Sequence, residues 1–132
     1  MLKRRILSVL LVLAMLVPFA GAAQTAQDNM RGVWVASVAN IDYPSSAGMT
    51  AQALAAEADT MLDNIAAMGL NTVSLQVRPS ADALYRSALF PQSRYVSGTC
   101  GASPDGDFDV LAYWVEGAHE RGLQLHAWIC LL

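Results

Sequence analysis

Charged and polar side chains follow the predicted strands, where loops usually place binding and catalytic groups. Arg78 ends a β-rich run and precedes Pro79, which cannot donate to a strand ladder. Its guanidinium could hold a carboxylate or orient a catalytic acid through a fixed fork of donors. The alternative is an ion pair with Asp82 or Asp42. Asn40 and Asp42 follow an earlier strand, and Asp42 is either a catalytic or ligand-binding carboxylate or a turn residue that bonds its own backbone.

Other candidate side chains share the strand faces with these positions. Gln76 points to the same strand face as Arg78, two residues earlier in the strand. It either bonds a ligand or fills a polar interior layer, and we favour the interior layer. His126 and Trp128 are two residues apart, so they point to the same strand face. His126 is either a site residue or a hydrogen-bonded interior histidine, whereas His119 is expected on a helix surface. The two histidines have no metal-ligand spacing, so we expect neither a metal nor a cofactor.

The strand predicted at residues 72–77 is the element around which the rest is organised. Gly69 before it suits the left-handed residue that ends a helix. Val73, Leu75 and Val77 face one way, and polar residues face the other. The apolar row is therefore expected under helices, and the polar row is expected to line an interior or its mouth.

Helix and strand signals alternate along the chain. In order, we predict a strand at 31–38, a helix capped by Thr50, the strand at 72–77, a long ordered loop at 79–107 with a short helical turn at 82–87, a helix capped by Asp107 or Asp109 and running to about residue 121, and a strand at 123–129. The residues expected to form the core stripe of the first helix are Leu54, Ala58, Met61, Leu62, Ile65 and Met68. Those expected on the inner face of the second are Leu111, Trp114, Val115 and Ala118. This βαβαβ order predicts an α/β fold with a parallel sheet.

The first residues of the 132-residue chain look like an export signal. A basic start precedes the apolar run 6–17 and small residues near 20–22, so residues 1–22 resemble a secretory signal peptide and 23–30 a linker. The alternative, an uncleaved anchor, needs a run of about 20 apolar residues. Removing the three leader cations takes the formal charge from −3 to −6, which argues against a nucleic-acid partner. We expect export to the periplasm or cell envelope and no other membrane association.

Cys100 and Cys130 are the two cysteines of the chain. An exported protein could oxidise them to a disulfide. Because Cys100 lies in a predicted loop and neither has a CxxC neighbour, we favour two unpaired thiols.

Several ordered motifs together carry a family resemblance. They are Arg31-Gly32-Val33-Trp34-Val35-Ala36, Asn40-Ile41-Asp42, Gln76-Val77-Arg78-Pro79, Asp82-Ala83-Leu84-Tyr85, Leu89-Phe90-Pro91, Ser97-Gly98-Thr99, Ala118-His119-Glu120-Arg121-Gly122-Leu123 and His126-Ala127-Trp128. With these motifs the chain resembles the glycosyl hydrolase-like 10 family from about Arg31 to Trp128. The sequence departs from the family pattern after Trp128, where an asparagine and a Pro-Tyr-Arg-like segment are expected and Ile129-Cys130-Leu131-Leu132 stands instead.

The resemblance implies a (β/α)₈ barrel, of which residues 31–132 supply the N-terminal βαβαβ part, truncated after the third strand. It also implies an exported enzyme that hydrolyses bacterial cell-wall, peptidoglycan-type glycan. The main acid and base pair is expected beyond Leu132, with Asp42 as a weak candidate within the chain, and the chain alone is expected to be inactive.

The resemblance also gives the candidate side chains their expected partners. Arg78, Gln76, Asp42, Asn40, His126 and Trp128 are the expected substrate-binding residues. The alternative function is a non-catalytic glycan-binding module that stacks sugars on Trp34, Tyr43, Tyr85 or Trp128. A self-contained flavodoxin-like domain is a third possibility, but three strands do not bury both faces of such a sheet.

Overall fold

The structure, a computed structural model, describes residues 29–131. The predicted signal peptide and most of the predicted linker lie outside these residues. The strands are β1 (Gly32–Val35), β2 (Thr72–Arg78) and β3 (Gln124–Ile129), and the helices are α2 (Ala51–Ala67), α3 (Arg94–Ser97) and α4 (Val110–Glu120). Two 3-10 turns, η1 (Val38–Asn40) and η2 (Asp105–Asp107), lie in the loops.

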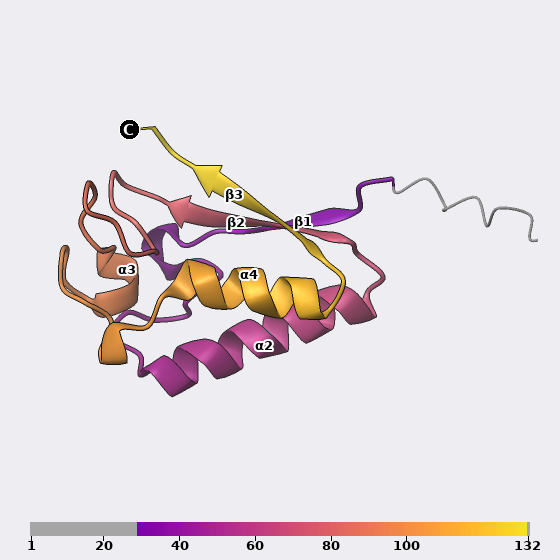
Figure 1. The fold of residues 1–132 in the computed structure, drawn as a ribbon, viewed down its shortest axis with the longest axis horizontal. Coiled ribbons are helices and arrows are strands. Elements are labelled where there is room, and N and C mark those ends of the chain that lie inside the picture. The colour runs from indigo at the N-terminus through magenta and orange to yellow at the C-terminus, as the bar shows by residue number, and fades with distance from the viewer. Residues whose placement is uncertain (1–28, 132) are drawn as a thin grey trace, which may run out of the picture.

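The three strands form one parallel sheet in the order β1-β2-β3. Helices α2 and α4 lie side by side on one face of this sheet, and all three strands run toward the end where α3 and the long loop gather (Figure 1). The predicted α/β class and parallel sheet are confirmed. The arrangement is compatible with the N-terminal part of a barrel, although these residues do not by themselves form a closed one.

Side-chain caps and glycines set the helix ends. Thr50 Oγ1 accepts a hydrogen bond from Ala53 N at 3.2 Å, as predicted. Of the two aspartates considered for α4, Asp109 is the cap, because its Oδ1 accepts from Ala112 N at 3.0 Å. Gly69, with φ +72°, has the left-handed conformation that a chain leaving a helix requires.

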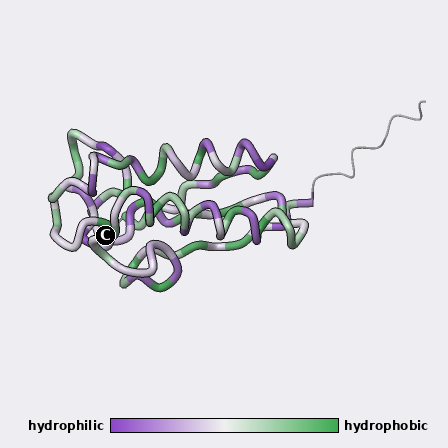
Figure 2. The backbone as a smooth tube through the Cα atoms, turned by 90° about the horizontal axis from the view of Figure 1, so that it is seen from below, coloured by the Kyte–Doolittle hydropathy of each residue, from purple (hydrophilic) through white to green (hydrophobic). Residues whose placement is uncertain are grey.

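The core lies between the sheet and the two long helices. Its strand side chains, Val73, Leu75 and Val77, are almost fully buried, and helix residues Leu54, Leu62 and Trp114 cover them. Hydropathy alternates from side to side along the helical coils (Figure 2), as a helix with one buried face requires. The prediction that Met68 belongs to this core is wrong: the residue follows the last turn of α2 and is 65% exposed.

Tyr43 anchors the loop after β1 in the core. Its ring is fully buried against Trp114 at 4.9 Å between centroids, edge to face, and its Oη donates to Leu54 O at 3.1 Å. Tyr43 therefore cannot be the sugar-stacking surface considered for a glycan-binding module.

Burial also raises the pKa of Tyr43 above the usual value of 10.0. The folded chain keeps this proton at a pH where the unfolded chain loses it. The contribution of the protonated Tyr43 to the free energy of unfolding is therefore complete below pH 10. As the pH rises toward the pKa of the folded chain, this contribution falls by up to about 1.4 kcal/mol per pH unit. We expect the free energy of unfolding of Tyr43→Phe, measured by urea titration, to fall less between pH 9 and pH 11 than that of the unsubstituted chain. Equal losses would contradict this assignment.

The first strand is shorter than predicted, ending at Val35 rather than at residue 38. Beyond Val35 the backbone donors of Ser37 and Val38 bond the side chain of Gln76, both at 2.9 Å, instead of continuing the ladder. The chain then turns through η1, where Ala39 and Asn40 have positive φ values.

The long loop is ordered, but its internal structure differs from the prediction. Residues 82–87 form no helical turn; Ala83 instead makes a β-bridge with Gln92, and the helical turn comes later, at α3. Both predicted free thiols are found: Cys100 is exposed and Cys130 partly buried, and neither is in a disulfide.

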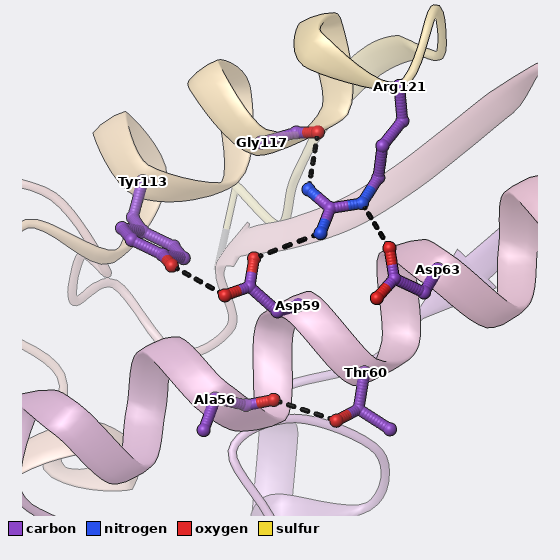
Figure 3. A network of polar contacts seen from close by, with 7 residues as sticks. All are labelled: Ala56, Asp59, Thr60, Asp63, Tyr113, Gly117 and Arg121. Atoms are coloured by element: carbon purple, nitrogen blue, oxygen red, sulfur yellow. Dashed lines mark hydrogen bonds and ion pairs between the residues drawn. The ribbon is translucent and has the colours of Figure 1, made fainter.

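A polar network joins the outer sides of α2 and α4 (Figure 3). Arg121 donates to Asp63 Oδ1 at 2.6 Å, to Asp59 Oδ1 at 3.2 Å and to Gly117 O at 3.0 Å. Tyr113 Oη donates to Asp59 Oδ2 at 2.8 Å, and this bond raises the pKa of Tyr113. At Gly117 a Cβ would stand 2.9 Å from Leu62 Cδ1, so glycine permits the close helix contact. The network is structural. His119 on α4 is exposed, as predicted.

Candidate functional site

The candidate site is the carboxyl end of the sheet, where the loops after β1 and β2 meet α3 (Figure 1). Of the four non-glycine residues with positive φ, Ala39 and Asn40 lie directly after β1 and Ala81 lies in the turn directly after β2. Such backbone strain persists only where the surroundings hold it, and it is often found at functional sites. In barrels and open α/β sheets this same end carries the binding residues.

Asn40 joins the loop after β1 to α3. Its Nδ2 donates to Pro44 O and to Tyr95 O, each at 2.8 Å, so both amide hydrogens are used within the chain. The side-chain oxygen is the group left to contact a ligand. The substrate-binding role predicted for Asn40 stays a prediction, and its bridging role is a finding.

Asp42 closes a turn at the end of β1. Its Oδ2 accepts from Ala36 N at 2.8 Å, and its own N–H donates to Ala36 O at 3.0 Å. The turn considered as the alternative for Asp42 is thus present. The residue is nevertheless exposed, and it lines a hollow of about 250 Å³ between β1 and α2, with Val33 and Met61 among the other lining residues. A contact with substrate through its other oxygen stays a prediction.

Gln76 is buried and ties the ends of the strands together. Its Oε1 accepts the two hydrogen bonds from Ser37 and Val38, and its Nε2 lies 3.3 Å from Cys130 Sγ. Ser37 Oγ donates in return to Gln76 O at 2.8 Å. This arrangement matches the favoured interpretation, a polar interior layer, because the acceptor oxygen is already occupied by backbone.

Arg78 ends β2 and reaches over an aromatic ring. Its guanidinium carbon lies 3.7 Å from the centroid of the Phe90 ring, a cation–π contact. Within residues 29–131 the ion pairs all belong to Arg121, so the considered pairing of Arg78 with Asp82 or Asp42 is wrong. Arg78 Nε is buried with no hydrogen-bond partner. The positive charge at the mouth is therefore not neutralised by a carboxylate of the described chain.

His126 and Trp128 lie on the sheet face opposite α2 and α4. In the register, His126 pairs with Ser74 and Trp128 with Gln76. Trp128 packs edge to face against Trp34 at 5.1 Å, and Trp34 is 64% exposed. The shared face predicted for His126 and Trp128 is confirmed, and within the described chain no helix covers it.

Sequence reasoning missed two features of the site. The Phe90 ring under Arg78 comes from twelve residues further along an irregular loop, where no periodicity signals a contact. A hollow of about 320 Å³, lined by Arg86, Gln92, Asp107 and neighbouring residues, lies within the same loop and includes none of the predicted site residues.

Within residues 29–131, no three His, Cys, Asp or Glu side chains gather in a way that could hold a metal ion. No helix in this part of the chain has both the length and the apolar character that crossing a bilayer requires.

Taken together, the described residues define an α/β segment whose polar groups gather at the carboxyl end of a parallel sheet, the position of the active site in barrel enzymes. Residues 29–131 match the model of the Glycosyl hydrolase-like 10 family, and the chain belongs to that family.

The chain is similar to two named relatives. It is 43% identical over 112 residues to "Glycosyl hydrolase YngK" of Bacillus subtilis. The aligned region covers 85% of this chain and 21% of the relative. It is 33% identical over 127 residues to "Glycosyl hydrolase DigH" of Escherichia coli K12, covering 87% of this chain and 28% of the relative. The chain thus spans about a quarter of the length of these proteins.

Proposed function

We propose that this chain is the N-terminal βαβαβ segment of an exported (β/α)₈ glycoside hydrolase that acts on bacterial cell-wall glycan. The family membership and the names of the relatives support glycosidase chemistry. The single observation that carries the role of this segment is the uncompensated Arg78 at the carboxyl end of β2.

Arg78 suits an acidic sugar. Stacking on Phe90 fixes the plane of the guanidinium and leaves its donors free of any carboxylate of residues 29–131. Peptide-free cell-wall glycan carries a free carboxylate on the lactyl group of each muramic acid residue, and a planar fork of N–H donors matches a carboxylate in two parallel hydrogen bonds. In this proposal Arg78 holds that group at the mouth of the barrel.

The chain alone is not expected to hydrolyse glycan. Glycosidases use two carboxyl groups placed about 5 to 10 Å apart across the scissile bond. Asp42 is engaged in its turn and Asp82 is 1% exposed, so neither is available as an unconstrained acid in the described residues. We place the main acid and base in the part of the relatives that this chain does not span.

The test is glycan binding by the chain with Arg78 replaced. We expect isothermal titration calorimetry with peptide-free glycan strands to detect binding, and Arg78→Ala to weaken it about tenfold or more, since charged hydrogen bonds contribute about 1.5–3 kcal/mol. Arg31→Ala is the matched control, because Arg31 is an exposed arginine next to Gly69, at the end of the sheet opposite the candidate site. Equal binding by both variants would contradict the role of Arg78.

A second candidate function, a non-catalytic glycan-binding module, is favoured by the exposed Trp34–Trp128 pair. Sugar rings stack on such surfaces without hydrolysis. If glycan binding depends on Trp34 and not on Arg78, this alternative is preferred.

Fractionation of cells that express the chain with residues 1–22 intact tests the proposed export.

A further inference from the structure

Asp82 is an unusual carboxylate for a structural residue. It lies in the turn after β2 and is 1% exposed, yet only its Oδ1 has a partner, Ser80 N at 3.1 Å. Its Oδ2 is buried without any hydrogen-bond donor. A buried carboxylate oxygen that lacks a donor destabilises the fold, and such groups call for a specific explanation.

Two neighbouring features in the sequence, at Ala81 and Arg78, are also energetically unfavourable in the free chain. Ala81, directly before it, has φ +57°, a left-handed conformation that costs free energy for a residue with a Cβ. Arg78, four residues earlier, has a buried Nε without an acceptor. A direct ion pair would satisfy both side chains, but the turn holds their charged atoms more than 4.0 Å apart. The turn therefore keeps an unmet donor and an unmet acceptor at one end of the sheet.

We infer that Asp82 is a second substrate-binding group, and that it recognises a hydroxyl of the same acidic sugar whose carboxylate Arg78 holds. This inference rests on the proposed function. Oδ2 is covered in the free chain, so the turn of residues 79–82 shifts on binding and releases the strain at Ala81. The tether between this turn and α3 is weak, a Ser80 Oγ to Tyr95 Oη contact of 3.4 Å. The ligand class is a saccharide that carries a carboxylate and a neighbouring hydroxyl.

The decisive variant is Asp82→Asn. Its amide oxygen keeps the bond from Ser80 N, while an NH₂ donor replaces only the unpartnered oxygen. We expect the melting temperature of the free chain to stay the same or rise, because a buried unpaired charge is removed. We also expect the Kd for peptide-free glycan strands to increase about tenfold or more, since an acceptor has become a donor. The matched control is Asp107→Asn, which neutralises an exposed aspartate of the same loop and should change neither value.

Glycan strands whose carboxylates have been reduced to alcohols separate the two groups. With this ligand, Arg78→Ala should no longer weaken binding, whereas Asp82→Asn should still do so. If Asp82→Asn lowers the melting temperature and leaves glycan binding unchanged, Asp82 is structural and the inference is overturned. If the unsubstituted chain binds no glycan, the proposed function fails first; if it binds in an Arg78-dependent way and Asp82→Asn binds equally well, only the present inference fails.

A measurement on the unsubstituted chain guards against a variant that does not fold. The ¹³C resonance of the Asp82 carboxyl carbon should shift when glycan strands are added, and that of Asp107 should not. An unchanged Asp82 resonance at saturating glycan would overturn the inference.

Discussion

Replacement of Trp114 by alanine is expected to lower the free energy of unfolding by about 3–5 kcal/mol, the usual cost of emptying a large aromatic site. Trp114 is fully buried between α2 and the sheet, and it also supports Tyr43, the residue that anchors the loop after β1. A small domain has about 5–15 kcal/mol in total, so this single substitution removes a large share of the stability. Urea titration followed by circular dichroism measures the change.

Leu89→Ala is the control for this experiment. Leu89 is 85% exposed in the long loop, and substitutions at such positions usually change stability by less than about 0.5 kcal/mol. If Trp114→Ala were no more destabilising than Leu89→Ala, the packing of α4 on the sheet described above would be wrong.

Replacement of Gln76 by leucine is expected to cost about 2–4 kcal/mol, although leucine is similar in size and more apolar. The substitution leaves the backbone donors of Ser37 and Val38 without their acceptor, and each buried group left unpaired costs about 1–3 kcal/mol. The loop after β1 should therefore loosen, which hydrogen exchange at Ser37 and Val38 would report.

The control is Gln124→Leu, a glutamine at the start of β3. Gln124 is exposed, its backbone N–H donates to Asn71 O at 2.8 Å, and its side chain makes no hydrogen bond within residues 29–131. We expect no measurable loss of stability there. Similar losses at both positions would mean that the strand ends are not tied together through the Gln76 side chain.

The features that sequence predicted well are those that local patterns determine. Alternation placed Val73 and Val77 in the core, and Thr50 capped its helix because a hydroxyl before a helical run has donors within reach. The shared face of His126 and Trp128 follows from strand geometry alone. These contacts need no information from distant parts of the chain.

The features that the sequence did not predict depend on distant contacts. β1 stops at Val35 because the backbone N–H of Ser37 donates to the side chain of Gln76, 39 residues away, and not to a neighbouring strand. Met68 fits the helical stripe in periodicity but stands one position beyond the last turn, where no neighbour covers it. Arg78 was predicted to be functional or ion-paired, and the stacking on Phe90 could not be derived from a loop without periodicity.

The relation to the longer relatives also bears on the open sheet face. Within residues 29–131, β1 and β3 each pair on one side only, and Trp34 and His126 are exposed on the face away from the helices. In a closed barrel such a face becomes the interior and such edges find neighbours. This is what we propose for the intact enzyme, of which the chain corresponds to about a quarter.

The most direct test of the central claim is to map glycan binding on the chain by NMR. We expect peptide-free cell-wall glycan strands to shift the backbone amide resonances at the carboxyl end of the sheet, around residues 40–42, 78–82 and 90–95. The amides around Gly69 and Gly122, at the opposite end, should not move. Shifts confined to that opposite end or to the outer faces of α2 and α4 would contradict the proposed site.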